Sequence, residues 1–160
     1  MSTIAAHIWK PSESRVVVLD SFVPVPRGAT FSAPAPLNWP AKDPEDVLDY
    51  QFDISPAVIG HDGDGIATLD VTARPNSAGD IEITNVSADG ARAIMWVAGG
   101  QSGTVYTVTI SITTTSGRAV NRSILLPVVS LATPAVLHNA IQTSEGLMLT
   151  DHTGNPILAA

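Results

Sequence analysis

The sequence contains no cysteine among its 160 residues. Without a thiol, the chain cannot form a disulfide framework, a thiolate metal site or a cysteine nucleophile. Its stability must therefore come from a buried apolar core, which a chain of this length is large enough to form. The length also matches the usual size of a single domain.

Charged residues are scarce, at 14% of the chain, and eight Lys and Arg against fifteen Asp and Glu give a net charge of -7. The basic residues are scattered singly, whereas a protein that binds nucleic acid needs clustered cations to displace counterions from the phosphates. Nucleic acid is therefore not an expected partner. A surface with so few charges can be covered by neighbouring subunits at little desolvation cost, which favours a role in an assembly.

Long apolar runs are also missing. The longest lie near SILLPVV (123–129), far short of the roughly 20 apolar residues that cross a bilayer as a helix. The N-terminal sequence MSTIAAHIWKPSESR has no basic start followed by an apolar stretch, so it does not have the pattern of a secretory signal peptide. We expect no membrane among the partners.

Proline is unevenly distributed, since seven of the twelve prolines lie between Pro11 and Pro44. Proline fixes φ and lacks the N–H that a β-ladder needs, so this composition predicts an extended, polyproline-like arm over residues 1–36. The β-branched stretch 15–23 is its one strand-like part. The arm docks either on a partner or on the chain's own domain. The aromatic residues that we expect to make such contacts are Trp9, Phe22, Phe31 and Trp39.

Residues 37–130 have the pattern of an all-β domain. Apolar and polar residues alternate in most of these segments, and Gly, Asp, Asn or Pro turns separate them. The expected strands cover residues 46–54, 66–74, 81–87, 91–98, 105–115 and 119–129. In the first of them the alternation places Asp49, Gln51 and Asp53 on one face, which we expect to be solvated. In 105–115 it directs one face toward the core, and the residues of that face are Tyr106, Val108, Ile110 and Ile112. Short strands with such punctuation indicate an immunoglobulin-like β-sandwich. The likeness is one of architecture only, because the cysteines of antibody domains are absent.

Residues 131–160 form a C-terminal arm in this interpretation. The sequence LMLTDHTGNPIL (147–158) predicts two short strands around DHTGN, which would make a small hairpin or add to a sheet edge. We find no internal repeat. The apolar residues that we expect to contact a partner here are Leu137, Leu147, Leu149 and Ile157.

The loop GHDGDG (60–65) offers His61, Asp62 and Asp64 as possible cation ligands. A calcium loop needs further oxygen ligands at fixed offsets, and none follows here. Asp-Gly pairs are also a common signal for tight turns. The sequence therefore favours a turn over a metal site, and we expect neither a metal nor a cofactor.

The stretch GGQSG (99–103) superficially resembles the elbow that carries a catalytic serine. That elbow requires Gly-x-Ser-x-Gly between a strand and a helix, whereas Ser102 is followed directly by Gly103 and then by an expected strand. The histidines, which such a serine would need as a base, fall in expected arms or turns. We predict no enzymatic activity.

Three stretches resemble the phage fiber–tail adaptor family. They are LNWPAKDPEDVLDYQFDIS (37–55), GDGIATLDVTA (63–73) and WVAGGQSGTVYTVTISITTTSGRAVNRSILLPV (96–128). The shared frame opens with W-P-x-K-D-P and closes with W-x-x-G-G-x-x-G-x-x-Y-x-V, T-x-x-G-R and L-P-V. The resemblance covers about residues 37–129, and the combination of Trp39, Lys42, Asp43 and Pro44 is its most specific part.

The resemblance implies a structural protein of the virion, assembled in the cytoplasm of the bacterial host, that joins the tail or neck to peripheral fibers. It transfers no catalytic residues. In this hypothesis the sandwich is a spacer, and of the two terminal arms, residues 1–36 and 131–160, one binds the tail side and the other the fiber side. Copies of the chain itself are a further expected partner. Two alternatives remain at this stage: a head-decoration or tail-tube domain of similar fold, and a carbohydrate-binding module that uses exposed tryptophans.

Overall fold

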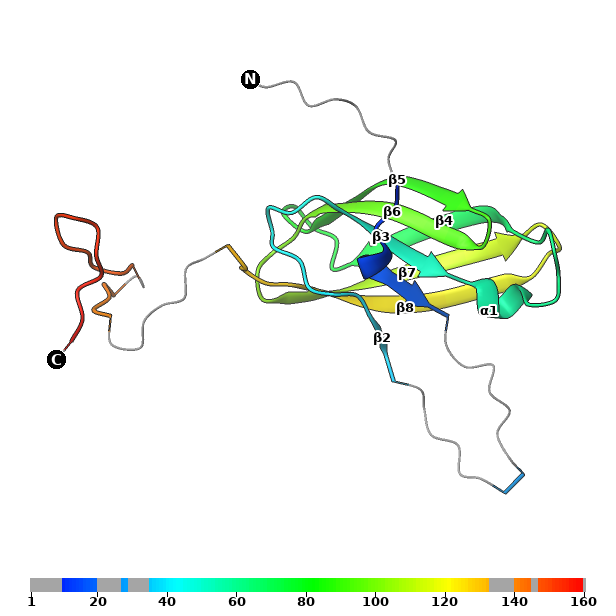
Figure 1. The fold of residues 1–160 in the computed structure, drawn as a ribbon, viewed down its shortest axis with the longest axis horizontal. Coiled ribbons are helices and arrows are strands. Elements are labelled where there is room, and N and C mark those ends of the chain that lie inside the picture. Colours follow the sequence, from blue (N-terminus) through cyan, green and yellow to red (C-terminus); the bar gives the residue numbers. More distant parts are fainter. Residues whose placement is uncertain (1–9, 20–26, 29–34, 133–139, 145–146, 160) are drawn as a thin grey trace. The chain divides into compact units, whose positions relative to one another are not determined.

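The computed structural model describes residues 10–19, 27–28, 35–132, 140–144 and 147–159. Contacts along the chain divide it into two compact units, Met1–Ser130 and Leu131–Ala160. The first unit contains every strand of the two sheets (Figure 1). None of the helices in the described part of the chain is long and apolar enough to cross a membrane.

The first unit is a sandwich of two four-stranded sheets (Figure 1). One sheet has the order β1 (Val16–Val18), β3 (Leu48–Asp53), β6 (Arg92–Gly99), β5 (Ile81–Asp89). The other has the order β2 (Leu37–Asn38), β8 (Ala119–Val128), β7 (Thr104–Thr114), β4 (Ile66–Arg74). The β-sandwich and its six expected strands are therefore confirmed, with strand ends that differ by one or two residues. The two described helices are one turn each, η1 (Glu13–Arg15) and α1 (Ser55–Val58).

Alternation along the strands produces the core. On β7 the side chains that point inward are almost fully buried, and the residues between them are half-buried or exposed. The inward residues are Tyr106, Val108, Ile110 and Ile112, as the sequence pattern predicted. Facing residues from the other sheet, including Phe52, Met95 and Val97, belong to the same apolar cluster. Burial of these side chains removes apolar surface from water, which is the main force that holds the two sheets together.

The outer face of β3 is buried, contrary to our expectation of a solvated face. Asp49 is 5% exposed and Gln51 is fully buried. Residues of the N-terminal segment cover them: the Ser12 N–H donates to Asp49 at 2.7 Å, and Gln51 donates to the Ser12 carbonyl at 2.5 Å. Arg15 adds an ion pair with Asp49 at 2.7 Å. Residues 10–19 of the expected arm are thus packed on the sandwich.

Each of the two N-terminal strands forms an edge of one sheet: β1 lies at the edge of the first sheet and β2 at the edge of the second. β1 pairs in parallel with β3, and β2 pairs in parallel with β8. The chain passes from one sheet to the other between Leu19 and Leu37. Of the strand expected over 15–23, the described part is Val16–Val18, and residues 20–23 lie outside the described residues. The opposite edges belong to β4 and β5.

Gly100, in the bend between β6 and β7, occupies a position that only glycine fits. Its φ is +104°, and a Cβ built there would lie 2.8 Å from Cγ2 of Ile81, 3.0 Å from Cγ2 of Val128 and 3.3 Å from the ring of Tyr106. These three neighbours belong to the buried cluster. The bend therefore brings the backbone itself into contact with the core.

Replacing Gly100 by alanine should lower the free energy of unfolding by about 3 kcal/mol or more, because positive φ and overpacking both penalise the new methyl group. Gly117 is the matched control, since its φ is +84° and nothing lies within 4 Å of the corresponding Cβ. Gly117→Ala should cost only about 1–2 kcal/mol. Urea denaturation of both variants measures the difference, and equal losses would show that contact with the core is unimportant at Gly100.

Candidate partner-binding surfaces

The W-P-x-K-D-P motif closes one end of the sandwich. The Lys42 side chain is fully buried, and its Nζ donates hydrogen bonds to the carbonyl oxygens of Asp43 at 2.7 Å and Gly99 at 2.6 Å. The Lys42 backbone N–H donates to Pro127 at 3.1 Å, and its carbonyl accepts from Val129 at 3.0 Å. One residue thus joins the entry to β3, the end of β6 and the end of β8.

The surroundings of the Lys42 ammonium group indicate that it stabilises the fold. Burial lowers the pKa of its ammonium group, and the nearby carboxylates of Asp46, Asp43 and Glu45 act in the opposite direction. Because the ammonium group is buried and hydrogen-bonded to backbone carbonyls, it is not exposed to a partner. A residue from the most specific part of the motif therefore stabilises the fold.

Lys42→Met should lower the free energy of unfolding by about 2 kcal/mol or more, because the carbonyls of Asp43 and Gly99 lose their charged donor. Removal of the ammonium's desolvation cost offsets part of the loss. Lys10→Met, at an exposed lysine, should change stability by no more than about 0.5 kcal/mol. Urea denaturation of the two variants makes the comparison. An unchanged midpoint for Lys42→Met would contradict the structural role.

Trp39, which we predicted as a contact for a partner, is 2% exposed. Its Nε1 donates to the Gln51 carbonyl at 2.9 Å, and its ring meets that of Tyr50 edge-on with the centroids 5.2 Å apart. The backbone N–H of Trp39 also bonds to Leu125 of β8 at 2.9 Å. The ring therefore fills the core, and neither face is open for stacking on a sugar.

Asp64, in the GHDGDG loop, closes the other end of the sandwich, where β7 ends. Its carboxylate accepts hydrogen bonds from Thr114, Thr115, the Ser116 backbone and Arg118. Burial raises its pKa, but these donors outweigh that effect and hold the pKa well below the usual range. The hydrogen bonds of this carboxylate thus go to the turn that joins β7 and β8. No group of three metal-ligating side chains occurs among the described residues.

The effect of Asp64 on stability should depend on pH. A carboxyl whose folded pKa is lowered stabilises the fold above its unfolded pKa of about 3.9, and that stabilisation disappears as pH falls toward the folded value. Asp64→Asn should therefore be less stable than the parent at pH 7, and the gap should narrow between about pH 5 and pH 2. Asp62→Asn, at an exposed residue of the same loop, is the control. Urea midpoints across this range test the idea, and a gap independent of pH would refute it.

Ser102 of the GGQSG stretch also has a structural contact. Its Oγ accepts hydrogen bonds from the backbone N–H and the hydroxyl of Ser130, both at 2.9 Å. Of the four histidines, His61 and His152 are described, and both are exposed. His7 and His138 lie outside the described residues. In the described part of the chain, Ser102 is therefore followed by strand β7 instead of a helix, and neither described histidine is placed beside it as a base.

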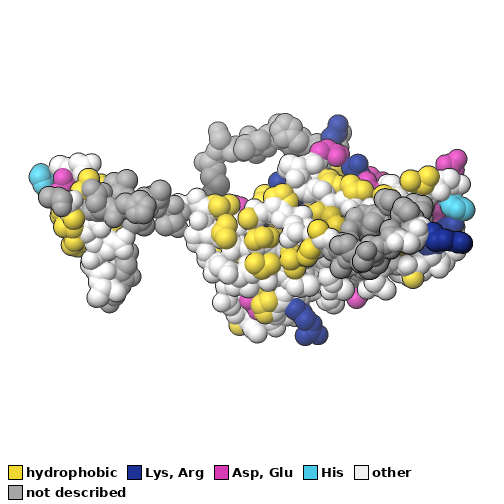
Figure 2. All heavy atoms as spheres, turned by 90° about the horizontal axis from the view of Figure 1, so that it is seen from below, with side chains coloured by type: hydrophobic (Ala, Val, Ile, Leu, Met, Phe, Trp, Pro, Cys, Tyr) yellow, Lys and Arg dark blue, Asp and Glu magenta, His cyan; other side chains and the backbone are white. Residues whose placement is uncertain are grey.

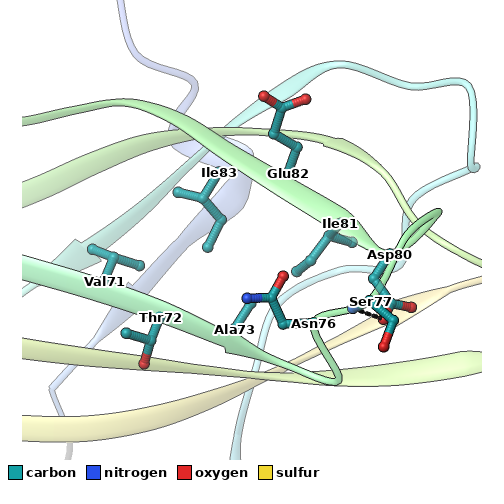
Figure 3. A pocket seen from close by; sticks show the side chains of 9 residues that line it. All are labelled: Val71, Thr72, Ala73, Asn76, Ser77, Asp80, Ile81, Glu82 and Ile83. Carbon is teal, nitrogen blue, oxygen red and sulfur yellow. Dashed lines mark hydrogen bonds between the residues drawn. The ribbon is translucent and has the colours of Figure 1, made fainter.

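A cleft of about 420 Å³ lies between the edge strands β4 and β5 (Figure 3). Figure 3 shows Val71 and Ile83 directed into the gap between the strands, whereas Glu82 points away from it. The remaining lining residues are Thr72, Ala73, Asn76, Ser77, Asp80 and Ile81. Asp80 is held in place by hydrogen bonds from the Ser77 backbone and the Tyr106 hydroxyl, both at 2.7 Å. The cleft is a hollow between two unpaired strand edges.

The face of the molecule drawn in Figure 2 is poor in charge. Figure 2 shows hydrophobic and uncharged side chains over most of the face it presents, with acidic and basic side chains few and scattered. Such a surface offers no field to steer a charged ligand. It suits contact with other protein surfaces.

The second unit contains a repeat that we did not find in the sequence. Isolated β-bridges join Gln142 to Met148 and Thr150 to Pro156, so two hairpins follow each other eight residues apart. The second of these is the hairpin predicted around DHTGN. In the first, the Thr143 N–H donates to the Leu147 carbonyl at 2.8 Å; in the second, the Asp151 N–H donates to the Asn155 carbonyl at the same distance.

The predicted contact residues of the second unit are exposed where the structure describes them. Leu147 is 65% exposed, and Leu149 and Ile157 are each 41% exposed. Leu137 lies outside the described residues, as do Trp9, Phe22 and Phe31 of the N-terminal arm. A role of these residues in binding a partner stays a prediction.

A comparison with protein families matches residues 42–127 to the family described as podophage GP4 fiber-tail adaptor protein gp77. No curated protein matches the chain. The matched segment runs from the closure at Lys42 through β3 to β8 and ends at Pro127, the residue to which the Lys42 N–H is bonded. β1, β2 and the second unit lie outside it.

Proposed function

The chain belongs to the podophage GP4 fiber-tail adaptor family, and from this premise we propose that it links the tail or neck of a virion to peripheral fibers through its terminal segments. The family match carries this proposal. The adaptor has a structural, non-enzymatic role: it binds a tail protein on one side and a fiber on the other. Which terminal segment binds which partner is left open.

The sandwich acts as the rigid spacer between the two partners. Its core is continuous across both sheets, and buried or hydrogen-bonded polar groups close each end, Lys42 at one and Asp64 at the other. A block of this kind transmits position and force without rearranging, because a close-packed core resists deformation.

Two observations support assigning the spacer to the immunoglobulin-like type. When β3 to β8 are named B to G, the sheets have the orders B-E-D and G-F-C of that fold, and β1 and β2 occupy the places of its first strand. The Tyr106 hydroxyl, near the start of β7, accepts a hydrogen bond from the Gln101 N–H at 2.9 Å. Such a bond is typical of the tyrosine corner in these domains.

The connectors are the segments outside the matched range. The family match covers residues 42–127, so the residues before 42 and after 127 lie outside the part of the chain that matches the family. Copies of the chain can also associate side by side, because β4 and β5 leave unpaired backbone groups along one flank of the sandwich. Added strands gain affinity from main-chain hydrogen bonds at such edges.

Deletion of residues 131–160 and, separately, of residues 1–9 should each remove one attachment while the sandwich stays folded. Residues 10–19 are kept because Ser12 and Arg15 cover β3. Virions carrying each deleted chain are scored for the adaptor by mass spectrometry and for fibers by electron microscopy. One deletion should abolish incorporation of the adaptor, and the other should leave the adaptor incorporated without fibers.

Urea denaturation of both purified deletion chains is the control for folding, and their midpoints should stay close to that of the parent. If both deleted chains are incorporated and carry fibers like the parent, the terminal segments are not the connectors. A virion that lacks the gene entirely and still carries its fibers would refute the adaptor function itself.

A further inference from the structure

The second unit has a hidden three-fold symmetry. Three apolar residues, Ile141, Leu149 and Ile157, follow each other at a spacing of eight residues. The residues that precede them, Ala140, Met148 and Pro156, have the same spacing and are half-buried. The same period thus governs two successive positions of the chain.

Main-chain hydrogen bonds close the three apolar positions into a ring. The Leu149 N–H donates to the Ile141 carbonyl, the Ile157 N–H donates to the Leu149 carbonyl, and the Ile141 N–H donates to the Ile157 carbonyl, each at 2.9 Å. Each residue of this ring donates one bond and accepts one. A closed cycle of identical bonds is the pattern of a three-fold axis.

The β-bridges obey the same symmetry. Moving the bridge between Gln142 and Met148 by eight residues gives the bridge between Thr150 and Pro156. A further step places Leu158 in the third equivalent position, and its partner is Ala140, which lies 24 residues before the position that a full further repeat would reach. One chain therefore builds three equivalent strand pairs.

The ring presents three equal apolar side chains. Ile141 is 39% exposed, and Leu149 and Ile157 are each 41% exposed. Among the described residues of the unit none is buried. A unit of about 30 residues without a buried core gains little stability of its own, because small chains need staples or association. A covering partner would supply the missing apolar contact.

Charge does not oppose such a partner. Asp151 is the only carboxylate among the described residues of the unit, and its Oδ1 accepts hydrogen bonds from Thr153 and Asn155 of its own hairpin. The described part of the unit therefore offers a partner an apolar ring, and its one described carboxylate is already hydrogen-bonded within its own hairpin.

We propose that this ring docks on the three-fold axis at the end of a homotrimeric fiber, so that one adaptor chain serves three fiber chains. This inference rests on the proposed function and specifies the symmetry of the partner. A homotrimer repeats one apolar surface three times around its axis. A single chain that places an aliphatic residue at three equivalent positions matches it with all three contacts, whereas an asymmetric or two-fold partner could not use the three positions equally.

Stoichiometry is the first test. The full-length chain is mixed with the purified recombinant fiber protein of the same phage, and the complex is weighed by native mass spectrometry. The expected complex contains one adaptor chain and three fiber chains. Three adaptor chains per three fiber chains would overturn the proposal, and so would a dimer of adaptors that forms through the ring and excludes the fiber.

Equivalence of the three positions is the second test. Ile141→Thr, Leu149→Thr and Ile157→Thr keep the backbone ring, and each should weaken binding to the purified fiber by about tenfold, to a similar extent, through lost apolar contact. Leu158→Thr is the matched control: Leu158 is 47% exposed, but Thr150 and Gln142 stand at the equivalent positions of the other two repeats, so its apolar side chain is not repeated. It should leave the affinity unchanged.

Loss of affinity confined to one ring position, or an equal loss for Leu158→Thr, would refute three-fold docking. Amide hydrogen exchange at the three ring residues reports whether each variant keeps the hydrogen-bonded ring. If exchange shows that a variant opens the ring, the stoichiometry of the unaltered complex still decides the proposal.

A comparison of virions that lack the adaptor with virions that carry the triple ring variant tests this inference separately from the proposed function. If particles without the adaptor lose their fibers and the chain with all three ring substitutions restores them fully, the adaptor function stands and three-fold docking fails. If particles without the adaptor keep their fibers, the proposed function fails instead. The expected result is that the triple variant is incorporated at normal levels but attaches no fibers.

Discussion

The buried ammonium group of Lys42 is the contact on which the closed sandwich depends. Its two hydrogen bonds to backbone carbonyls join a segment before β3 to the end of β6, and its own backbone joins both to the end of β8. Burying a charge is costly unless donors and acceptors are paired. Here the cost is offset by direct bonds to carbonyls, and the result is a fixed meeting point of three segments far apart in sequence.

The two ends of the range that matches the family meet in the folded structure. The match begins at Lys42 and ends at Pro127, and these two residues are hydrogen-bonded to each other. Within that span, Gly100 allows the bend to approach the core, and Trp39 seals it just outside the matched range. What this chain has in common with its family is therefore a closed block, and the block's motifs maintain its structure.

The two units of the chain are stabilised by different means. The sandwich has a continuous core of side chains that are almost fully buried, so it holds its shape alone. The described residues of the second unit have no core, and main-chain hydrogen bonds define their fold while Ile141, Leu149 and Ile157 stay exposed. One chain thus combines a unit held together by a side-chain core with a unit whose described residues are held together by main-chain hydrogen bonds.

Much of the sandwich was predictable, because alternation with period two is a local property of the sequence. It located Tyr106, Val108, Ile110 and Ile112 in the core. The burial of Asp49 and Gln51 was not predictable, because it arises when residues 10–19 pack on β3 from outside. The eight-residue spacing of the C-terminal apolar residues is present in the sequence, but we did not predict a repeat from it. A pattern that extends over only two full repeats gives a weak signal.

The sequence by itself determined the β-sandwich and, through the W-P-x-K-D-P and W-x-x-G-G motifs, the family. Both follow from local pattern: alternation sets which face of a strand is apolar, and motifs keep their residues in order along the chain. Only the tertiary structure decided what those residues do. In the folded structure Lys42 and Trp39 are buried. The Asp64 carboxylate is hydrogen-bonded to the turn between β7 and β8. Main-chain hydrogen bonds join Ile141, Leu149 and Ile157 into a ring. Each of these outcomes depends on contacts between residues distant in sequence, which local pattern does not encode.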